Sequence, residues 1–286
     1  MNHKEMWKNV FGDSDKYTDF FFKEKAKRSV VYSKYDNDDL TSMAFFRMCP
    51  VVYRGLECVC PYIVGVATQK ELRGKGYMRG LLGQGLADVK NQGLPVAFLS
   101  PADPAIYKSL GFEGMYYRKR LEVKDNQRKW YTAATFSRLD SVGKERVAEF
   151  AKAQLHASEL DLYLQHDAEY YELLHKEMKS LGGKVIVLRE GQFIRGVAAY
   201  IYEEGTYEVT EVICDPADGR KVMQSICAFL MERLDKAVVF DDSYFLGDVA
   251  GEGVRVQQMD KPYIMVKNLQ EEAEKRSLQV YINDLT

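Results

Sequence analysis

The chain has 286 residues, which exceeds the usual size of one domain and favours two, each able to bury its own core. Forty basic residues against 42 acidic ones leave a formal net charge of -2, so no overall field favours nucleic acid or an anionic membrane. No run of about 18 apolar residues could span a bilayer, and the N-terminal residues lack the apolar core of a signal peptide.

Five cysteines are spread along the chain: Cys49, Cys58, Cys60, Cys214 and Cys227. An odd count at this density does not make a disulfide framework, and the cysteines and histidines do not have the spacing of a zinc site. Cys58 and Cys60 should share one face of a strand, because side chains of a strand repeat every two residues. We therefore expect reduced thiols, no metal, a cytoplasmic protein, and no role for the four histidines.

The first clear strand pattern begins at Val51. Residues 51–53, a turn at Arg54-Gly55 and residues 56–60 predict a β-hairpin. Residues 62–68, "YIVGVAT", are too continuously apolar to be half exposed, so they should form a central strand.

A helix should follow the turn after this strand. Apolar residues recur there at helical spacing: Met78, Leu81, Leu82, Leu86 and Val89. Three glycines inside the segment, Gly80, Gly83 and Gly85, each cost roughly 1 kcal/mol of helix propensity against alanine, which suggests close backbone packing. Gly93 ends the helix, and residues 94–100 supply a second buried strand, so the segment predicts a right-handed crossover between parallel neighbours.

The next element is a short helix with clear boundaries. Asp103 is a natural N-cap, Pro104 suits the first helical position, and Gly111 can adopt the left-handed conformation after the end. Tyr107 then falls in the second turn, directly after a strand. Residues 115–123, "MYYRKRLEV", predict a closing strand.

A polar stretch at residues 124–132 predicts a linker, and a second block of elements follows it. Its order of elements repeats that of the first block, which indicates a duplicated domain. The expected helices cover residues 141–155, 169–181 and 219–234, and the expected strands cover 184–190, 193–202, 206–215 and 237–242. The turn "PADGRK" of the second block has a single glycine, Gly219, so any chemistry of the turn belongs to the first block.

The strand-turn-helix junction of the first block has the properties of an anion site. Backbone N–H groups at a helix start have no intrahelical acceptor, and the helix dipole adds positive potential. Gly74 and Gly76 allow close approach of a ligand, while Arg73, Lys75 and Arg79 add three cations, which favours a pyrophosphate. The alternative is a solvated basic turn.

Two common phosphate motifs do not match. A Walker A loop needs Lys and then Ser or Thr after its last glycine, but Tyr77 and Met78 follow Gly76. A dinucleotide G-x-G-x-x-G motif needs a glycine where Arg79 stands.

The junction instead resembles the acetyl-coenzyme A signature of the GNAT superfamily of N-acetyltransferases, Q/R-x-x-G-x-G/A, with "ELRGKG" at residues 71–76. The strand "IVGVAT", the strand ending "LS" and "AIYKSLGF" follow the family's order. With a degenerate second block, the chain looks most like the enhanced-intracellular-survival type. Proteins of this type have an active N-terminal acetyltransferase domain, then an inactive copy of it, and usually a sterol-carrier-like domain at the end. The sequence ends at Thr286, before such a domain, and Glu71 departs from the motif.

The resemblance implies an α/β (α+β) fold of two tandem GNAT-like domains, each a mixed, mostly antiparallel sheet with a parallel splayed strand pair and flanking helices. It implies a catalytic domain at 1–125, a degenerate domain at 126–269 and a tail at 270–286. Acetyl-CoA would be the cosubstrate, and Tyr107 would protonate the departing thiolate, although its alternative role is core packing. The implied cofactor-binding residues are Val64, Val66, Ala67, Thr68, Arg73, Gly74, Lys75, Gly76, Tyr77 and Met78.

The acceptor implied by the resemblance is a primary amine of a small molecule, a peptide or a lysine. An alkyl amine with a pKa near 10.4 is mostly protonated at pH 7, so a base or a dry pocket is required. Glu57, Asp103 and the Thr286 carboxylate are all candidates for the base, and the sequence does not choose among them. The alternative function is an acetyl-CoA sensor without transferase activity. Relatives often assemble through their two domains, so a homo-oligomer is also open.

One further expectation concerns the aromatic run Phe20, Phe21 and Phe22. Three consecutive positions cover most of a helix's circumference, so part of the run should belong to the core. Early helices border the acceptor cleft in the superfamily, and one of the three rings is a candidate to line it.

Overall fold

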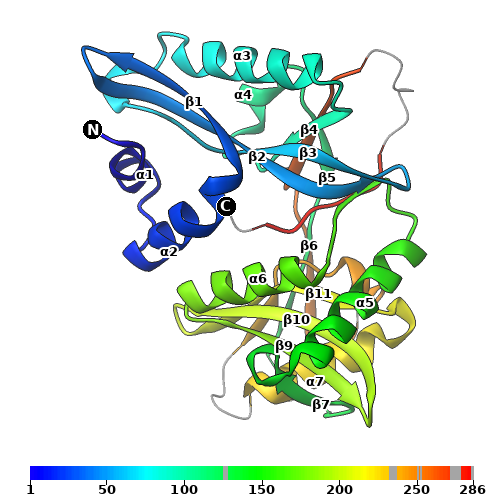
Figure 1. Ribbon diagram of the computed structural model, residues 1–286. Coiled ribbons are helices and arrows are strands. Elements are labelled where there is room, and N and C mark those ends of the chain that lie inside the picture. Colours follow the sequence, from blue (N-terminus) through cyan, green and yellow to red (C-terminus); the bar gives the residue numbers. More distant parts are fainter. Residues whose placement is uncertain (125–127, 232–236, 250, 252, 271–277, 285–286) are drawn as a thin grey trace. The chain divides into compact units, whose positions relative to one another are not determined.

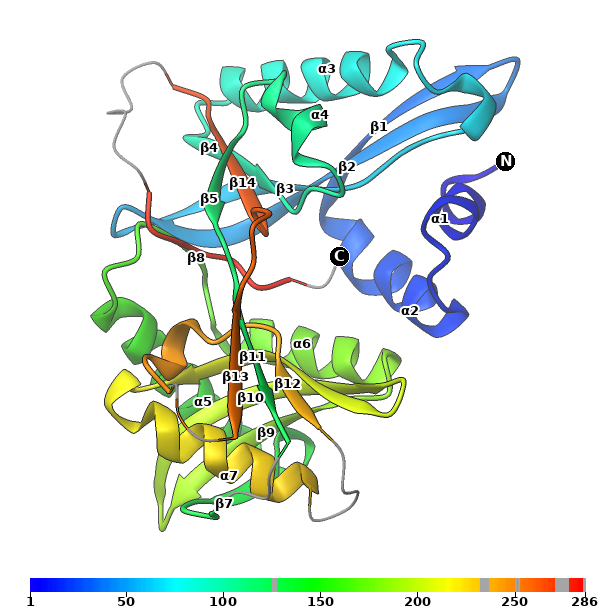
Figure 2. The same cartoon turned by 180° about the vertical axis from the view of Figure 1, so that it is seen from behind.

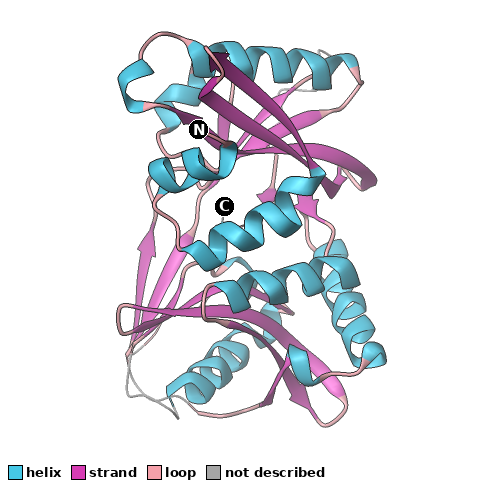
Figure 3. Ribbon diagram, turned by 60° about the vertical axis from the view of Figure 1, so that its left-hand side comes forward, coloured by secondary structure: helices cyan, strands magenta, loops and turns pink. Residues whose placement is uncertain are grey.

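The computed structural model describes residues 1–124, 128–231, 237–249, 251, 253–270 and 278–284 (Figure 1). The chain divides into two compact units. The first comprises Met1–Tyr116, Leu160–Leu164 and Lys261–Thr286, and the second comprises Tyr117–Glu159 and Gln165–Asp260. Each unit is built around its own β-sheet, and Figure 3 shows helices on both sides of the strands.

The first unit begins with two helices, α1 (His3–Phe11) and α2 (Asp15–Phe20), followed by a π-helical turn at Phe21–Lys25 and a 3-10 turn at Ala26–Arg28. Asn2 and Glu5 form a capping box at the start of α1. Phe20 and Phe21 are buried and Phe22 is half-buried, so the expectation that part of the aromatic run belongs to the core is confirmed.

The first sheet has the strand order β15-β8-β2-β3-β4-β14-β5, with β1 also paired to β2. Its strands are β1 (Ser29–Asp36), β2 (Asp39–Tyr53), β3 (Leu56–Thr68), β4 (Val96–Leu99), β5 (Glu113–Tyr116), β8 (Leu162–Leu164), β14 (Ile264–Asn268) and β15 (Val280–Tyr281). The predicted hairpin is confirmed but is much longer than expected, and both turn residues, Arg54 and Gly55, have positive φ.

Helices α3 (Tyr77–Asn91) and α4 (Pro104–Lys108) lie beside the first sheet. The predicted crossover is confirmed, since β3 and β4 are parallel and α3 connects them. Buried residues of α3, α4 and the sheet form one apolar cluster: Ala44, Phe46, Ile63, Leu81, Leu82, Leu86, Val89, Ala97, Leu99, Tyr107, Phe112, Met265 and Leu269.

The three glycines of α3 do not share one role. A Cβ at Gly85 would lie 2.4 Å from Cζ of Phe46, so close packing is right for this position. Gly80 and Gly83 are exposed and have no neighbour within 4 Å of such a Cβ, so the expectation of close packing is wrong for them. The sequence marks all three alike, because helix propensity does not reveal which face of a helix is buried.

The second sheet has the order β13-β6-β12-β11-β10-β9-β7. Its strands are β6 (Lys119–Val123), β7 (Thr132–Thr135), β9 (Lys184–Glu190), β10 (Phe193–Glu203), β11 (Thr206–Cys214), β12 (Val238–Phe240) and β13 (Val254–Gln258). Its helices are α5 (Ser141–Ala157), α6 (Ala168–Ser180) and α7 (Gly219–Met231). Figures 1 and 2 show α6 and α7 on opposite sides of this sheet. Two mostly antiparallel sheets with flanking helices confirm the expected fold class.

The prediction of one closing strand at residues 115–123 is wrong. The segment breaks at Tyr117 and Arg118 into β5 and β6, which belong to different sheets. In the first sheet β14 lies antiparallel between β4 and β5 (Figure 2), and in the second sheet β6 lies antiparallel between β12 and β13. Each sheet is therefore completed by a strand that comes late in the sequence, β14 in the first sheet and β13 in the second.

The units also divide the chain differently from the expected stretches 1–125, 126–269 and 270–286. β8, from the middle of the chain, pairs with β2 at Val51–Tyr53, a part of β2 that β1 does not reach. The C-terminal residues return to the first unit, where β15 pairs with β8. Open backbone groups along β2 and β8 account for this arrangement, because a buried sheet edge must be paired.

A buried ion group anchors the C-terminal segment. The carboxylate of Asp284 accepts hydrogen bonds from Lys25, at 3.0 Å, and from the guanidinium of Arg47. All three side chains are at most 8% exposed. Because one carboxylate is the shared counter-ion of two buried cations, it fixes residues 25, 47 and 284 together.

Candidate active site

The first unit contains a strand with a free edge. β3 pairs with β4 only at Tyr62 and Ile63, so Val64–Thr68 extends beyond its neighbour and the sheet splays open there. The register of β2 and β3 shifts at the same place, between Met43 and Phe45, which leaves one extra residue on β3. A β-bulge of this kind bends a strand and increases its twist.

Gly65 makes this bulge. Its φ of +57° lies in the left-handed region, and a Cβ there would be 2.4 Å from the Trp7 ring. Trp7 in turn stacks on Phe21, with ring centroids 4.0 Å apart. The aromatic packing of α1 and the π-helical turn therefore requires glycine at the point where the sheet opens.

The end of β3 is held by hydrogen bonds. The hydroxyl of Ser42 bonds to the carbonyl oxygen of Ala67 and to the Thr68 hydroxyl, both at 2.8 Å. Val64 and Ala67 are buried, whereas Val66 and Thr68 are half-buried. The free edge of β3 is thus a fixed row of backbone groups onto which an extended ligand can add as a further strand.

The turn after β3 leaves backbone amides open. Gly74 and Gly76 have φ values of +79° and +82°, and a Cβ at either would meet nothing within 4 Å. Gly76 is the N-cap of α3, and no side chain caps the helix. The first intrahelical bond runs from Gly80 N to Gly76 O, so the amides of Tyr77 and Met78 have no intrahelical acceptor.

The charge around the turn is positive. Arg73, Lys75 and Arg79 are exposed on it, and Glu71 lies exposed in the preceding 3-10 turn, Lys70–Leu72. Arg73 donates to the carbonyl oxygen of Thr68 at 3.3 Å, which ties the turn to the strand end. Open amides, a helix N-terminus and these cations lie next to the free strand edge, an arrangement that suits an anionic ligand.

Tyr107 lies in α4, on the side of the sheet covered by α3. The predicted boundaries of α4 are confirmed. Asp103 caps the helix by accepting a hydrogen bond from Ala105 N at 2.9 Å, and Gly111, which follows the helix, has a φ of +83°. Tyr107 is 8% exposed, and its hydroxyl makes no hydrogen bond within the described residues. Burial raises the pKa of the phenol, which therefore stays protonated at neutral pH.

The three candidate bases are placed differently. Asp103 is exposed and serves as the cap of α4. Glu57 is exposed at the hairpin end of β3, six residues before Ile63 and about 20 Å from it by strand geometry. Thr286 lies outside the described residues.

Two positioning contacts could not be read from the sequence. Lys267 in β14 donates to the carbonyl oxygen of Leu110 at 2.7 Å, and Arg79 donates to the Ser109 hydroxyl at 2.9 Å. Both contacts hold the end of α4, the helix that carries Tyr107. Lys267 lies more than 150 residues away in the sequence, and no motif marks the pair.

The corresponding junction of the second unit is closed. A Cβ at Gly219, the first residue of α7, would lie 2.1 Å from the carbonyl oxygen of Leu246. Cys214, at the end of β11, donates to the carbonyl oxygen of Phe245 at 3.2 Å. The 3-10 turn Tyr244–Leu246 thus covers the strand end and helix start that are open in the first unit.

Among the described residues no group of three or more His, Cys, Asp or Glu side chains could hold a metal ion. None of the helices in the described ranges is long and apolar enough to cross a bilayer. Cys58 and Cys60 share one face of β3 as predicted, with sulfur atoms 3.8 Å apart.

Comparison with known proteins supports the fold and the first unit's family. The family model "Acetyltransferase (GNAT) domain" matches residues 2–115. No curated protein sequence matches the chain.

Solved structures match both units of the chain. A probable N-acyltransferase from Enterococcus faecalis is 16% identical, with a TM-score of 0.71, over 93% of this chain and 69% of that one. A GCN5-related N-acetyltransferase from Anabaena variabilis is 13% identical, with a TM-score of 0.72 and the same coverage. Eis1 from Mycobacterium abscessus is 11% identical, with a TM-score of 0.60, over 95% of this chain and 71% of that one. At these identities the likeness shows the fold.

Proposed function

We propose that the protein is an N-acetyltransferase that moves acetyl from acetyl-CoA to a primary amine, because the model of the GNAT acetyltransferase domain matches residues 2–115. The acceptor amine belongs to a small molecule, a peptide or a lysine. The amine attacks the thioester directly, and Tyr107 acts as general acid.

The observation that carries the proposal is the continuity of the free strand edge with the open turn. In acetyl-CoA, amide groups of the pantetheine arm precede a pyrophosphate. Val66 and Thr68 would pair with those amides, and the backbone of residues 73–78 would bind the pyrophosphate, with Arg73 and Lys75 neutralising its charge. The order of donors along the chain fits the order of groups along the cosubstrate.

Tyr107 supplies the proton for the leaving group. When the tetrahedral intermediate collapses, the carbon–sulfur bond breaks and the electron pair goes to sulfur. The phenol O–H donates its proton to that sulfur, because burial raises its pKa and keeps it protonated. The amine must lose a proton before or during attack; among the candidate bases, Glu57 lies at the far end of β3, and Asp103 is exposed and caps α4.

We further propose that catalysis belongs to the first unit alone. In the second unit the 3-10 turn Tyr244–Leu246 lies over the start of α7 and the end of β11, where a cosubstrate would have to bind.

The five cysteines are free thiols, which agrees with a reducing, cytoplasmic setting for the protein.

The test is a thiol-release assay with acetyl-CoA and a panel of primary amines, including polyamines, aminoglycosides, lysine and peptides. The proposal expects thiol release that depends on at least one amine, and an acetylated product by mass spectrometry. If the protein binds coenzyme A but no amine of the panel stimulates thiol release, the sensor function is favoured instead.

A further inference from the structure

A cavity lined by positively charged side chains lies in the second unit. It has a volume of about 500 Å³ and lies at the outer strand of the second sheet, β7, which pairs only with β9. Its lining comes from β7, the 3-10 turn Phe136–Arg138, α6, the start of β9 and α7. A cavity of this volume suits a small organic molecule.

The ionisable residues that line the cavity are all basic. They are Arg138, His175, Lys179 and Lys184, and no Asp or Glu is among the lining residues. Arg138, Lys179 and Lys184 form no ion pair within the described residues. Glu172, the carboxylate of α6 that acts on His175, pairs instead with Lys144 at 2.6 Å.

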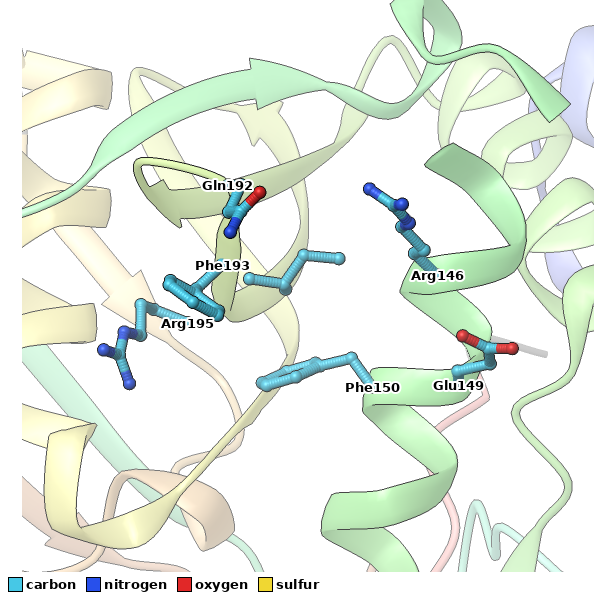
Figure 4. A pocket seen from close by; sticks show the side chains of 7 residues that line it. Arg146, Glu149, Phe150, Gln192, Phe193 and Arg195 are labelled. Carbon is cyan, nitrogen blue, oxygen red and sulfur yellow. The ribbon is translucent and has the colours of Figure 1, made fainter. Parts of the chain in front are cut away.

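A larger cavity of the same unit provides the contrast. It measures about 800 Å³ and is lined by Arg146, Glu149, Phe150 and the residues from Gln192 to Arg195 (Figure 4). Glu149 offsets Arg146 there, and Arg195 points away to pair with Glu190 at 2.7 Å. Its charges are balanced, whereas those of the smaller cavity lack a counter-ion.

The loop before β9 lies between two of the cations, Lys179 and Lys184. Gly183 N donates to the carbonyl oxygen of Met178 at 2.7 Å, and a Cβ at Gly183 would lie 1.9 Å from the carbonyl oxygen of Tyr200. The backbone between Lys179 and Lys184 is therefore tightly packed. Lys179 and Lys184 flank this packed loop, and both line the cavity with exposed side chains.

The remaining lining defines the rest of the ligand. Thr135 and Ser137 offer hydroxyl groups beside the cations, while Ala133, Ala134, Val185 and Phe229 offer apolar surface. Burial lowers the pKa of His175, so its imidazole is neutral at pH 7 and can donate one N–H. A guanidinium, two ammonium groups and hydroxyls suit the several oxygens of a phosphate group.

We propose that this cavity binds a small organic phosphate, with the phosphate group between Arg138, Lys179 and Lys184 and its organic part against Phe229 and Val185. The site is separate from the anion site of the first unit. It gives the second unit a binding role that does not depend on acetyl transfer.

Isothermal titration with phenyl phosphate tests the proposal. The protein carries Gly76→Glu, which removes the anion site of the first unit, and inorganic phosphate and benzoate are titrated in parallel. We expect one molecule of phenyl phosphate to bind per chain, and to bind more tightly than inorganic phosphate or benzoate. Arg138→Gln combined with Lys184→Gln should raise its Kd at least tenfold, while Arg146→Gln, which removes a cation from the other cavity, should leave it unchanged.

Several outcomes would overturn the proposal. These are absence of phenyl phosphate binding, an unchanged Kd in the double variant, or an equal loss in the Arg146→Gln control. Benzoate binding as tightly as phenyl phosphate would refute the phosphate assignment. Circular dichroism verifies that each variant is folded, and Lys179→Gln alone replaces the double variant if that protein does not fold.

Discussion

At the scale of single residues, the structure gives Tyr107 an environment that suits a proton donor. Its side chain is 8% exposed among Leu99, Phe112 and Met265, and burial raises the pKa of its phenol. In the proposed role, the Tyr107 phenol hydrogen-bonds to the thioester sulfur and transfers its proton to it as the carbon–sulfur bond breaks.

Replacing Tyr107 by Phe should therefore lower kcat about 100-fold while leaving acetyl-CoA affinity unchanged, because the ring still packs and only the O–H is lost. Steady-state kinetics and calorimetry measure the two quantities. Tyr131→Phe, a buried tyrosine of the second unit, is the matched control and should retain full kcat. Unchanged turnover of Tyr107→Phe would remove the assignment.

The same pKa shift predicts a pH dependence. A general acid acts in its protonated form, so a raised pKa moves the loss of activity to higher pH. We expect kcat to show no decrease between pH 7 and about 9.5, below the ordinary phenol pKa of about 10. A decrease centred near pH 8 that Tyr107→Phe abolishes would show that the phenol is more acidic than its burial implies.

At the scale of elements, α3 combines open and packed glycines in a single helix. Gly83 is exposed with no neighbour within 4 Å of an added Cβ, and Gly85 lies against Phe46. The cost of glycine in a helix is the same at both positions, but only Gly85 serves packing.

We therefore expect opposite effects from the two alanine substitutions. Gly83→Ala should stabilise the protein by about 1 kcal/mol through helix propensity. Gly85→Ala should destabilise it by about 1–3 kcal/mol, since the methyl group would collide with the Phe46 ring. Urea unfolding measures both, and an equal gain in stability from the two variants would contradict the packing.

Much of the first unit's local structure could be predicted from its sequence. The caps of α4, the crossover from β3 to β4 and the helical stripe of α3 follow from local rules, and all three are present. The bulge at Gly65 could not be predicted, because its cause is the ring of Trp7, almost 60 residues away in the sequence. The break between β5 and β6 has the same origin, since strand pairing depends on distant partners that local patterns do not contain.

At the scale of the whole molecule, contacts between distant parts of the sequence complete the first unit. β14 inserts between β4 and β5, Lys267 of β14 holds the end of α4, and Asp284 joins Lys25 and Arg47. The C-terminal residues are therefore part of the unit that carries the candidate active site. Domains assigned as continuous segments of the sequence do not reveal this.

The buried ion group yields a prediction about stability. Asp284→Asn leaves Lys25 and Arg47 without their shared counter-charge, so it should cost about 3–5 kcal/mol in the free energy of unfolding. Chemical denaturation measures the loss. Asp36→Asn, on the exposed strand β1, should change stability by less than about 0.5 kcal/mol. A similarly small effect of Asp284→Asn would show that the group does not anchor the C-terminal segment.

The central claim is that the open turn at residues 73–78 binds the pyrophosphate of acetyl-CoA. Calorimetric titration of coenzyme A into the wild-type protein, Gly76→Glu and Lys221→Glu tests it most directly, since Lys221 lies in the first turn of α7, the corresponding helix of the second unit. We expect one site per chain, at least a 100-fold loss of affinity in the folded Gly76→Glu variant, and wild-type affinity in Lys221→Glu. Wild-type affinity in Gly76→Glu, or a comparable loss in Lys221→Glu, would contradict it.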